Sequence, residues 1–546
     1  MGGIGDIIVN NNELVRKSDS GLLYLTDKGR EVIAPQVTSI DSNVYAMTEA
    51  ADPVTTAAAM ARLSRNSNDL RTIIASEFTG NSNDEAVLQR VVAQYGDDSV
   101  KQLLPMSVVF EGISNIATKE VEWGRVAAYL EQSTRYLRFD KKDEHGNYGY
   151  FTPEDIGDNT EIYQAAMNEI FDTYSDLYES MLEYYRSNSK TPEAERDAAW
   201  RQATHAAACD AIRGVLPAST KATVGVVGSA QAIENMILHL ESSRLQEMKD
   251  LGAKALAAVR MVAPVFFERT DNPAQGGLMS EHTYQTQEAS TQLADKLLGD
   301  LPEVQYTEPR VEMVGRYASE DELVEKILFD SSNKPFALIH EAVENMKDGD
   351  KKAVIETYVG ERYNRRAKPG RAFELPHYTF EVQCDYGAFR DIQRHRMVDA
   401  LEWQPLNPVI GYETPQAVAD AGLAEKYQHA FDISRQLYDT LTDTGHGDQA
   451  QYATLFGHIM RFTATFNARS MTHTAELRTT PQGHPNYRRV FQQMHEQIAA
   501  VHPNIAAAMK FVSQTEDEEL ARLGAERNRK AKLARLGGDY EQHMIE

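Results

Sequence analysis

Two cation-rich segments in the second half of the chain have the composition of an anion-binding site. The first segment, RYNRRAKPGR, holds five cations within ten residues: Arg362, Arg365, Arg366, Lys368 and Arg371. One guanidinium group can bind two phosphate oxygens at once, and a Pro-Gly loop lets backbone N–H groups approach an anion. The same cations could instead pair with acids on a solvated surface, and this segment alone leaves both interpretations open.

The second segment, RDIQRHR, places His395 between Arg394 and Arg396. Two flanking cations favour the neutral imidazole, which suits a site that holds an anion and moves protons or hydrides. A metal site is not expected, because no partner histidine or carboxylate stands at ligand spacing. The alternative is a helix face whose arginines pair with Asp or Glu.

In the first half of the chain, Glu131, Ser133 and Arg135 fall within EQSTRYLRF, where we expect a helix to end. A carboxylate, a hydroxyl and a guanidinium could together bind a nucleotide, although simple helix capping explains the same residues. Further along, Arg213 precedes Leu216-Pro217.

Near the end of the chain, FNARSMTHTAELR predicts a helix that carries Asn467, Arg469, Ser470, His473 and Arg478. Asn467 and Arg478 are eleven residues apart, about three turns, and therefore share a face. An asparagine side chain can both donate and accept hydrogen bonds, as the edge of a flavin or pyrimidine requires.

Hydrophobic periodicity predicts the elements that must position these groups. We expect a hairpin around Asp27-Lys28-Gly29 and strands over 107–114 and 377–384. We expect helices over 115–137, 160–187, 191–213, 229–263, 321–346, 387–403, 419–443 and 450–476, and a helical pattern in the charged tail 516–546.

An internal repeat underlies this pattern. VVFEG at 108–112 resembles YTFEV at 378–382, and GRVAAYLEQ at 124–132 resembles HRMVDALEW at 395–403. Arg396 follows Arg125 by 271 residues, and Glu402 follows Glu131 by the same number. Constant spacing across a strand and a helix indicates a duplication, although short apolar words can also match by chance.

Composition limits the function classes. The chain has 546 residues, 42% of them apolar, with 56 basic and 81 acidic side chains and a net charge of −25. So acidic a protein is not expected to bind nucleic acid or anionic membranes. Its two cysteines form no disulfide framework, and the most apolar stretch, 255–267, is interrupted by Arg260 and too short to span a bilayer. These features favour a cytoplasmic protein.

Together the motifs resemble the flavin-dependent thymidylate synthases, the ThyX family. Its signature is Arg-His-Arg, a serine eight residues after the last arginine, then Arg-x-Val-Leu-Pro and Asn-Ala-Arg-Ser…Leu-Arg. The first copy keeps Ser133, Arg135 and Arg213 but has Trp123-Gly124 before Arg125 and Glu241 at the last arginine. The second copy keeps Arg394-His395-Arg396, Asn467 and Arg478 but has Gln404 and Gln451 at the other positions.

The resemblance implies reductive methylation of dUMP to dTMP with FAD, NADPH and methylenetetrahydrofolate. It assigns substrate binding to Glu131, Ser133, Arg135, Arg213 and Arg478. It assigns flavin binding to Arg371, Glu374, Arg394, His395, Arg396, Asn467 and His473. Complementary losses suggest that one copy serves the nucleotide and the other the flavin, in a homodimer that mimics the family's tetramer. The alternatives are an enzyme of this fold with another substrate and a non-catalytic flavin- or nucleotide-binding scaffold.

The expected fold is α+β and rich in helices, with two tandem ThyX-like domains, each an antiparallel or mixed sheet packed with long helices. The expected boundaries are an arm over 1–44, repeats over 45–268 and 310–513, a linker over 269–309 and a helical tail over 514–546.

Overall fold

The computed structural model describes residues 13–79, 100–302, 304–515 and 520–540. The chain divides into two compact units. Unit 1 comprises residues 1–110, 123–130 and 224–299, and unit 2 comprises 111–122, 131–223 and 300–546. Parts of the predicted first repeat therefore lie in each unit, and the repeat boundaries stay a prediction.

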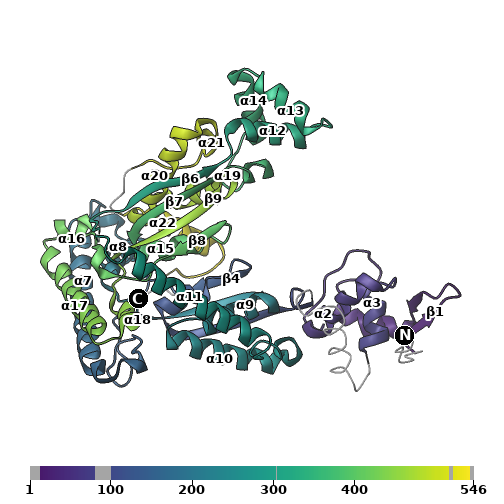
Figure 1. Cartoon of the computed structure of the whole chain (residues 1–546), viewed down its shortest axis with the longest axis horizontal. Coiled ribbons are helices and arrows are strands. Elements are labelled where there is room, and N and C mark those ends of the chain that lie inside the picture. The colour runs from purple at the N-terminus through teal and green to yellow at the C-terminus, as the bar shows by residue number, and fades with distance from the viewer. Residues whose placement is uncertain (1–12, 80–99, 303, 516–519, 541–546) are drawn as a thin grey trace. The chain divides into compact units, whose positions relative to one another are not determined.

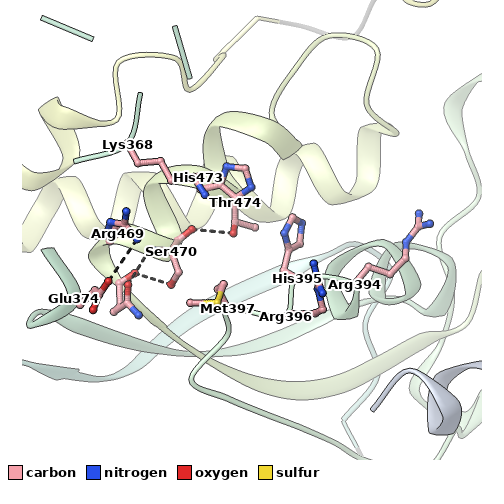
Figure 2. Close-up of a pocket in the computed structure, with 11 residues that line it drawn as sticks. Lys368, Glu374, Arg394, His395, Arg396, Met397, Arg469, Ser470, His473 and Thr474 are labelled. Atoms are coloured by element: carbon pink, nitrogen blue, oxygen red, sulfur yellow. Dashed lines mark hydrogen bonds and ion pairs between the residues drawn. The ribbon is translucent and has the colours of Figure 1, made fainter. Parts of the chain in front are cut away.

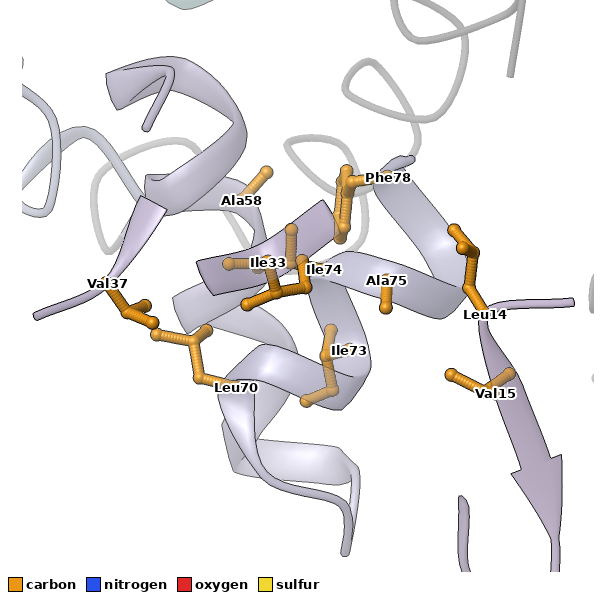
Figure 3. Close-up of a cluster of buried hydrophobic side chains, with 11 residues drawn as sticks. Leu14, Val15, Ile33, Val37, Ala58, Leu70, Ile73, Ile74, Ala75 and Phe78 are labelled. Atoms are coloured by element: carbon orange, nitrogen blue, oxygen red, sulfur yellow. The ribbon is translucent and has the colours of Figure 1, made fainter. Parts of the chain in front are cut away.

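Unit 1 begins with an apolar cluster formed by short elements (Figure 3). Leu14, Val15, Ile33, Ile74 and Phe78 are among its buried side chains. Thr26 and Asp52 cap two of its helices by accepting backbone N–H groups, as N-cap residues do. The elements of this part are β1 (Val15–Lys17), β2 (Leu23–Leu25), α1 (Asp27–Ile33), α2 (Pro53–Arg62) and α3 (Leu70–Ile73).

The rest of unit 1 combines a three-stranded sheet with helices. The strands, whose ends belong in part to unit 2, are β3 (Pro105–Ser114), β4 (Ala127–Glu131) and β5 (Lys221–Ser229), in the order β3-β5-β4. The helices are α9 (Ala230–Glu241), α10 (Gln246–Val262) and α11 (Gly276–Leu298).

Unit 2 contains a four-stranded antiparallel sheet in the order β6-β7-β9-β8 (Figure 1). Its strands are β6 (Arg310–Tyr317), β7 (His377–Asp385), β8 (Ala400–Trp403) and β9 (Ile459–Asn467). Nine residue pairs join β7 to β9, from His377 opposite Asn467 to Asp385 opposite Ile459. Helix α20 (Pro485–Val501) contacts β6 and β7.

The remaining helices of unit 2 follow the hydrophobic pattern. In α7 (Thr160–Ser187), Tyr163, Met167, Tyr174 and Met181 are buried on one face, which packs on α8 and α17. The other helices are α6 (Asn115–Val121), α8 (Ala198–Ile212), α12 (Glu320–Asp330), α13 (Phe336–Glu344), α14 (Asp348–Val359), α15 (Tyr386–Gln393), α16 (Gln416–Asp420), α17 (Ala424–Asp443), α18 (Gly447–Ala450), α19 (Ala468–Arg478), α21 (Pro503–Ala508) and α22 (Leu523–Arg535).

The two halves of the chain use one plan. The orders β3-β5-β4 and β7-β9-β8 both place the third strand of the repeat between the first two. Ser114 caps α6 and Asp385 caps α15, again 271 residues apart, each by accepting the N–H three residues on. The predicted α+β fold, rich in helices and built on a repeated sheet, is confirmed.

Three predicted helices are wrong in part. The helix predicted over 115–137 ends at Val121 and gives way to β4, and the helix predicted over 387–403 ends at Gln393 and gives way to β8. The middle of the helix predicted over 450–476 is β9, and its helical part begins at Ala468. Each segment is also apolar at helical spacing, but pairing with a neighbouring strand supplies its backbone hydrogen bonds.

Two further predictions are corrected in unit 1. The hairpin is formed by β1 and β2, and Asp27-Lys28-Gly29 instead opens helix α1, because Thr26 caps that helix. The segment 269–309 contains the 23-residue helix α11, which contacts α9. No helix in the described ranges has the length and apolarity to cross a bilayer.

Candidate functional site

Glu131 lies at the centre of a buried ionic cluster. Arg390 Nη2 is 2.6 Å from Glu131 Oε1, Lys119 Nζ is 3.0 Å from Oε2, and Thr118 Oγ1 donates to Oε1 at 3.0 Å. Burial alone would raise the pKa of Glu131, but Arg390 and Lys119 lower it to about 2. Both carboxylate oxygens are thus engaged within the protein, and they support the turn that follows β4.

That turn carries Ser133 and Arg135. The Ser133 hydroxyl accepts the N–H of Arg135 at 3.3 Å. Arg135 makes a two-pronged ion pair with Asp210 of α8, at 2.8 and 2.7 Å, and donates to the Tyr487 hydroxyl at 2.9 Å. The opposed charges hold the pKa of Asp210 well below its usual range despite burial. Arg135 is therefore fixed by groups from both halves of the chain.

Arg213 is buried beneath this region. Its exposed fraction is 2%, and Nη1 lies 3.3 Å from Asp391 Oδ2. Asp385 Oδ1 lies 3.9 Å from its Nη2. Among the described residues no hydrogen-bond acceptor meets its Nε or Nη2, so two donors of a buried cation stay available.

Gly387 makes room for this guanidinium. A Cβ at position 387 would lie 3.2 Å from Arg213 Nε and 2.9 Å from Asp385 Oδ1. We expect Gly387→Ala to lower the free energy of unfolding by about 1–3 kcal/mol, because overpacking outweighs the gain in helix propensity. Gly349→Ala, at a helical position with open space, is the control, and we expect it to be neutral or stabilising. Urea unfolding measures both; equal stabilisation would contradict the prediction.

Arg478 connects the Arg-His-Arg segment to helix α19. Its Nε donates to His395 Nε2 at 2.6 Å, and its Nη1 lies 3.3 Å from Asp391 Oδ1. Burial, then Arg478, hold the pKa of His395 well below its usual range. This lowered pKa agrees with the predicted neutral imidazole, although burial rather than the flanking arginines is its first cause, and Nε2 accepts from Arg478.

Most of the predicted flavin-binding residues line one cavity of about 250 Å³, here called the histidine cavity (Figure 2). Four cations and one acid contribute to its wall, together with neutral His395 and His473. Its lining residues are Lys368, Glu374, Arg394, His395, Arg396, Met397, Asn467, Arg469, Ser470, His473 and Thr474. His473 Nδ1 is buried with no hydrogen-bond partner among the described residues, so the wall holds an unused polar atom.

Helix α19 orients one side of the histidine cavity. Asn467 caps the helix by accepting the N–H of Ser470 at 2.8 Å, while its Nδ2 donates to Asp399 at 3.1 Å. It thus uses both functions of its amide. Arg469 reaches Glu374 at 3.4 Å, across the cavity wall shown in Figure 2.

Four of the five cations of RYNRRAKPGR are outside the lining of the histidine cavity: Arg362, Arg365, Arg366 and Arg371. Arg362 is buried and pairs with Glu476 at 2.5 and 2.6 Å, so the acid-paired interpretation holds for this residue. Arg371 is outside the cavity lining; its side chain is 84% exposed and pairs with Glu374 at 3.1 Å. Of this segment, Lys368 reaches the histidine cavity.

A second cavity of about 660 Å³, here called the Arg135 cavity, also lies in unit 2. Arg135 and Asp210 line it together with loop residues 481–484 and with Pro485, Asn486 and Arg489 of α20. Arg489 pairs with Glu413 at 2.7 Å. Its volume is within the range of small-molecule sites.

Tyr487 joins the two cavities. Its hydroxyl accepts from Arg135, and the Arg478 guanidinium carbon lies 5.2 Å from its ring centroid. Arg478 in turn donates to His395. A continuous chain of contacts therefore runs from Arg135 of the first repeat to His395 of the second.

The sequence did not predict the two acids that hold this chain of contacts in place. Asp391 pairs with Arg213, Arg394 and Arg478, and Asp210 pairs with Arg135. The sequence offered one signal, since Asp391 stands inside RDIQRHR as its single acid. No group of three or more potential metal ligands occurs in the described part of the chain.

Buried histidines predict how stability depends on pH. Burial lowers the pKa of His458 to about 3, and its Nδ1 accepts the N–H of Leu455 at 2.9 Å. The folded protein keeps this group neutral, while the unfolded chain protonates it below about pH 6.5. Above about pH 7, His458 therefore does not lower the free energy of unfolding. Below about pH 6.5 it lowers that free energy by about 1.4 kcal/mol per pH unit, until the pH reaches the pKa of the folded protein.

We expect the free energy of unfolding of the wild type to fall relative to that of His458→Asn as the pH falls from 7 to 5, because the variant lacks the titrating histidine. Urea midpoints at matched pH values measure this difference. A difference that stays constant over this range would show that His458 takes up its proton in the folded protein.

The family model described as "Thymidylate synthase complementing protein" matches residues 46–265 and 314–504. The chain belongs to this family. Each match covers one repeat, so the chain carries two domains of the thymidylate synthase complementing protein family in tandem.

Two relatives match this chain over most of both lengths. A UPF0159 protein from Thermoplasma acidophilum is 30% identical over 504 residues, covering 86% of this chain and 97% of the relative. A UPF0159 protein from Chlamydia pneumoniae is 29% identical over 92% of this chain and 97% of its own length.

Shorter matches carry functional names. The flavin-dependent thymidylate synthase from Clostridium tetani is 26% identical over 183 residues, which are 33% of this chain and 67% of that protein. Among solved structures, the UMP/dUMP methylase PolB from Streptomyces cacaoi bound with 5-Br dUMP matches with a TM-score of 0.32 and 20% identity, over 38% of this chain and 97% of that one.

Proposed function

We propose that this chain is a flavin-dependent methylase that converts dUMP to dTMP, with methylenetetrahydrofolate as carbon donor and NADPH as reductant. The family membership and the flavin-dependent thymidylate synthase relatives support the reaction class. The observation that carries the proposal is the contact chain Arg135–Tyr487–Arg478–His395, which links the histidine cavity of the second repeat to the Arg135 cavity, whose lining comes from both repeats and the C-terminal segment.

The histidine cavity fits the charged part of FAD. Its lining cations Lys368, Arg394, Arg396 and Arg469 outnumber the single acid Glu374, which suits a diphosphate. About 250 Å³ is too little for the whole cofactor, so we assign this cavity to one part of it. When bound, the flavin supplies the two-electron reduction that converts the transferred methylene into a methyl group.

The Arg135 cavity is our proposed nucleotide site. Arg135 would bind the phosphate, and Ser133 would position the turn that carries it. Glu131 would act indirectly, because its oxygens already bind Arg390, Lys119 and Thr118. Arg213 would reach the phosphate only after a rearrangement that exposes its two unused donors.

The neutral His395 is the proposed contact between the two ligands. Arg478 holds its Nε2, and a neutral imidazole beside fixed cations neither repels a phosphate nor competes for it. Asp391 accepts from Arg478 and Arg394, and so keeps both guanidinium groups in place.

The test uses purified full-length protein. We expect it to be yellow, to release FAD on denaturation and to release tritium from 5-³H-dUMP when methylenetetrahydrofolate and NADPH are present. Flavin without tritium release would favour a different substrate. A colourless protein with no affinity for dUMP would favour the scaffold alternative.

A further inference from the structure

The C-terminal segment supplies one wall of the Arg135 cavity. The family model ends its second match at residue 504, yet Leu520, Ala521 and Arg522 line this cavity together with Arg135 and Asp210. The described part of this segment, residues 520–540, is called the tail here. The tail residues in this wall therefore lie outside the part of the chain that the family model matches.

Arg522 is fixed within that wall. Its Nη2 lies 3.0 Å from Asp210 Oδ2, and its guanidinium carbon lies 4.5 Å from the centroid of the Tyr136 ring. Its Nη1 approaches the carbonyl oxygen of Arg135 at 3.5 Å. The exposed fraction of the residue is 7%, so its charge acts in a partly desolvated environment.

Helix α22 anchors the tail on α8. Lys530 Nζ lies 2.8 Å from Asp197 Oδ2, and Arg527 Nη2 lies 3.0 Å from Glu195 Oε2. Tyr540 is buried against Ala198 and Ala199. Arg522 therefore belongs to a docked element and is held in place before any ligand binds, which reduces the entropy lost on binding.

The charges around the cavity depend on Arg522. The described lining residues include four cations and three acids: Arg135, Lys190, Arg489 and Arg522 against Asp210, Glu413 and Asp420. Arg489 is neutralised by Glu413, and Asp210 is shared between Arg135 and Arg522. Without Arg522 the lining would hold three cations and three acids. With Arg522 the lining has one positive charge in excess.

We propose that Arg522 is a ligand-binding residue that the tail contributes to the Arg135 cavity, where it binds the phosphate of a nucleoside monophosphate. The identity of the nucleotide rests on the proposed function. The anion preference rests on the geometry and charge of the cavity alone. Asp210 holds the guanidinium groups of Arg135 and Arg522 next to each other in the cavity wall, and a pair of neighbouring guanidinium groups suits a phosphate.

The test compares full-length wild type with Arg522→Gln by calorimetric titration with dUMP, deoxyuridine and inorganic phosphate. We expect Arg522→Gln to weaken dUMP binding by about 10- to 100-fold, the effect of losing a charge-assisted hydrogen bond, and to leave deoxyuridine binding unchanged. Arg529→Gln is the matched control on the same tail, since Arg529 is outside the cavity lining, and we expect wild-type affinities.

Three results would overturn the proposal: unchanged dUMP affinity in Arg522→Gln, an equal loss for dUMP and deoxyuridine, or no binding of dUMP or phosphate by the wild type. The first two leave the proposed methylase intact, because wild-type dUMP binding and tritium release are unaffected by them. Phosphate binding that depends on Arg522, without nucleotide binding, would keep the anion site and remove the methylase. If Arg522→Gln does not fold, Arg522→Lys retains the charge without the forked donor geometry, and we expect it to bind dUMP more weakly than wild type and deoxyuridine equally well. Wild-type dUMP affinity in Arg522→Lys would then overturn the proposal.

Discussion

Replacing Glu131 by glutamine is expected to lower the free energy of unfolding by about 3–5 kcal/mol, the usual cost of leaving buried charges without their partner. Arg390 and Lys119 both point at this carboxylate, and their side chains are 6% and 2% exposed. After the substitution, Arg390 keeps its contact with Thr134 but has no acid, and Lys119 keeps Glu122. Urea unfolding followed by tryptophan fluorescence measures the change, since Trp200 and Trp403 both lie in unit 2.

The repeat supplies a matched control for Glu131. Glu402 follows it by 271 residues at the corresponding place in the second repeat and is exposed. We expect Glu402→Gln to change stability by less than about 0.5 kcal/mol. If Glu131→Gln were as stable as Glu402→Gln and lost nucleotide affinity alone, Glu131 would be a direct ligand of the sugar and the ionic cluster would be incidental.

Arg478→Ala is expected to lower the rate of dTMP formation by at least about 100-fold, equivalent to about 2.7 kcal/mol of transition-state stabilisation. Arg478 donates to His395 Nε2, pairs with Asp391 and lies over the Tyr487 ring. Its loss therefore breaks the chain of contacts between the two cavities. Its removal also leaves a buried acceptor on His395 without a donor.

Two further variants make the Arg478 result specific. Arg478→Lys keeps the charge but cannot reach His395 and Asp391 together, and we expect an intermediate rate. Arg435→Ala removes an exposed arginine that pairs with Asp439 on α17, and we expect the wild-type rate. A wild-type rate in Arg478→Ala, with FAD and dUMP still bound, would show that the contact chain has no part in the reaction.

The sequence predicted those elements whose stability comes from their own periodicity. Helix α7 occupies the predicted range 160–187, because its apolar residues recur every three to four positions along 28 residues. Strands β3 and β7 lie where β-branched and aromatic residues are concentrated. The start of α19 was not predicted, because the helix expected over 450–476 placed Asn467 in its interior, whereas Asn467 ends β9 and caps α19.

Elements that depend on distant partners were not predictable. Strands β4 and β8 are five and four residues long and continue an apolar helical pattern, so only pairing within their sheets identifies them as strands. The ion pairs of the site also join residues that are far apart in the sequence. His395 could be predicted to be neutral from its neighbours in sequence, but Asp391 meets Arg213 across 178 residues and Arg390 meets Glu131 across 259.

The central claim is that one chain joins a flavin site in its second repeat to a nucleotide site that contains Arg135 of its first. A crystal structure of the full-length protein with FAD and dUMP tests it most directly. We expect flavin density beside His395 and Asn467 and nucleotide phosphate density beside Arg135, with Arg478 between them. Density for both ligands away from these residues, in a protein that binds them in solution, would contradict the claim.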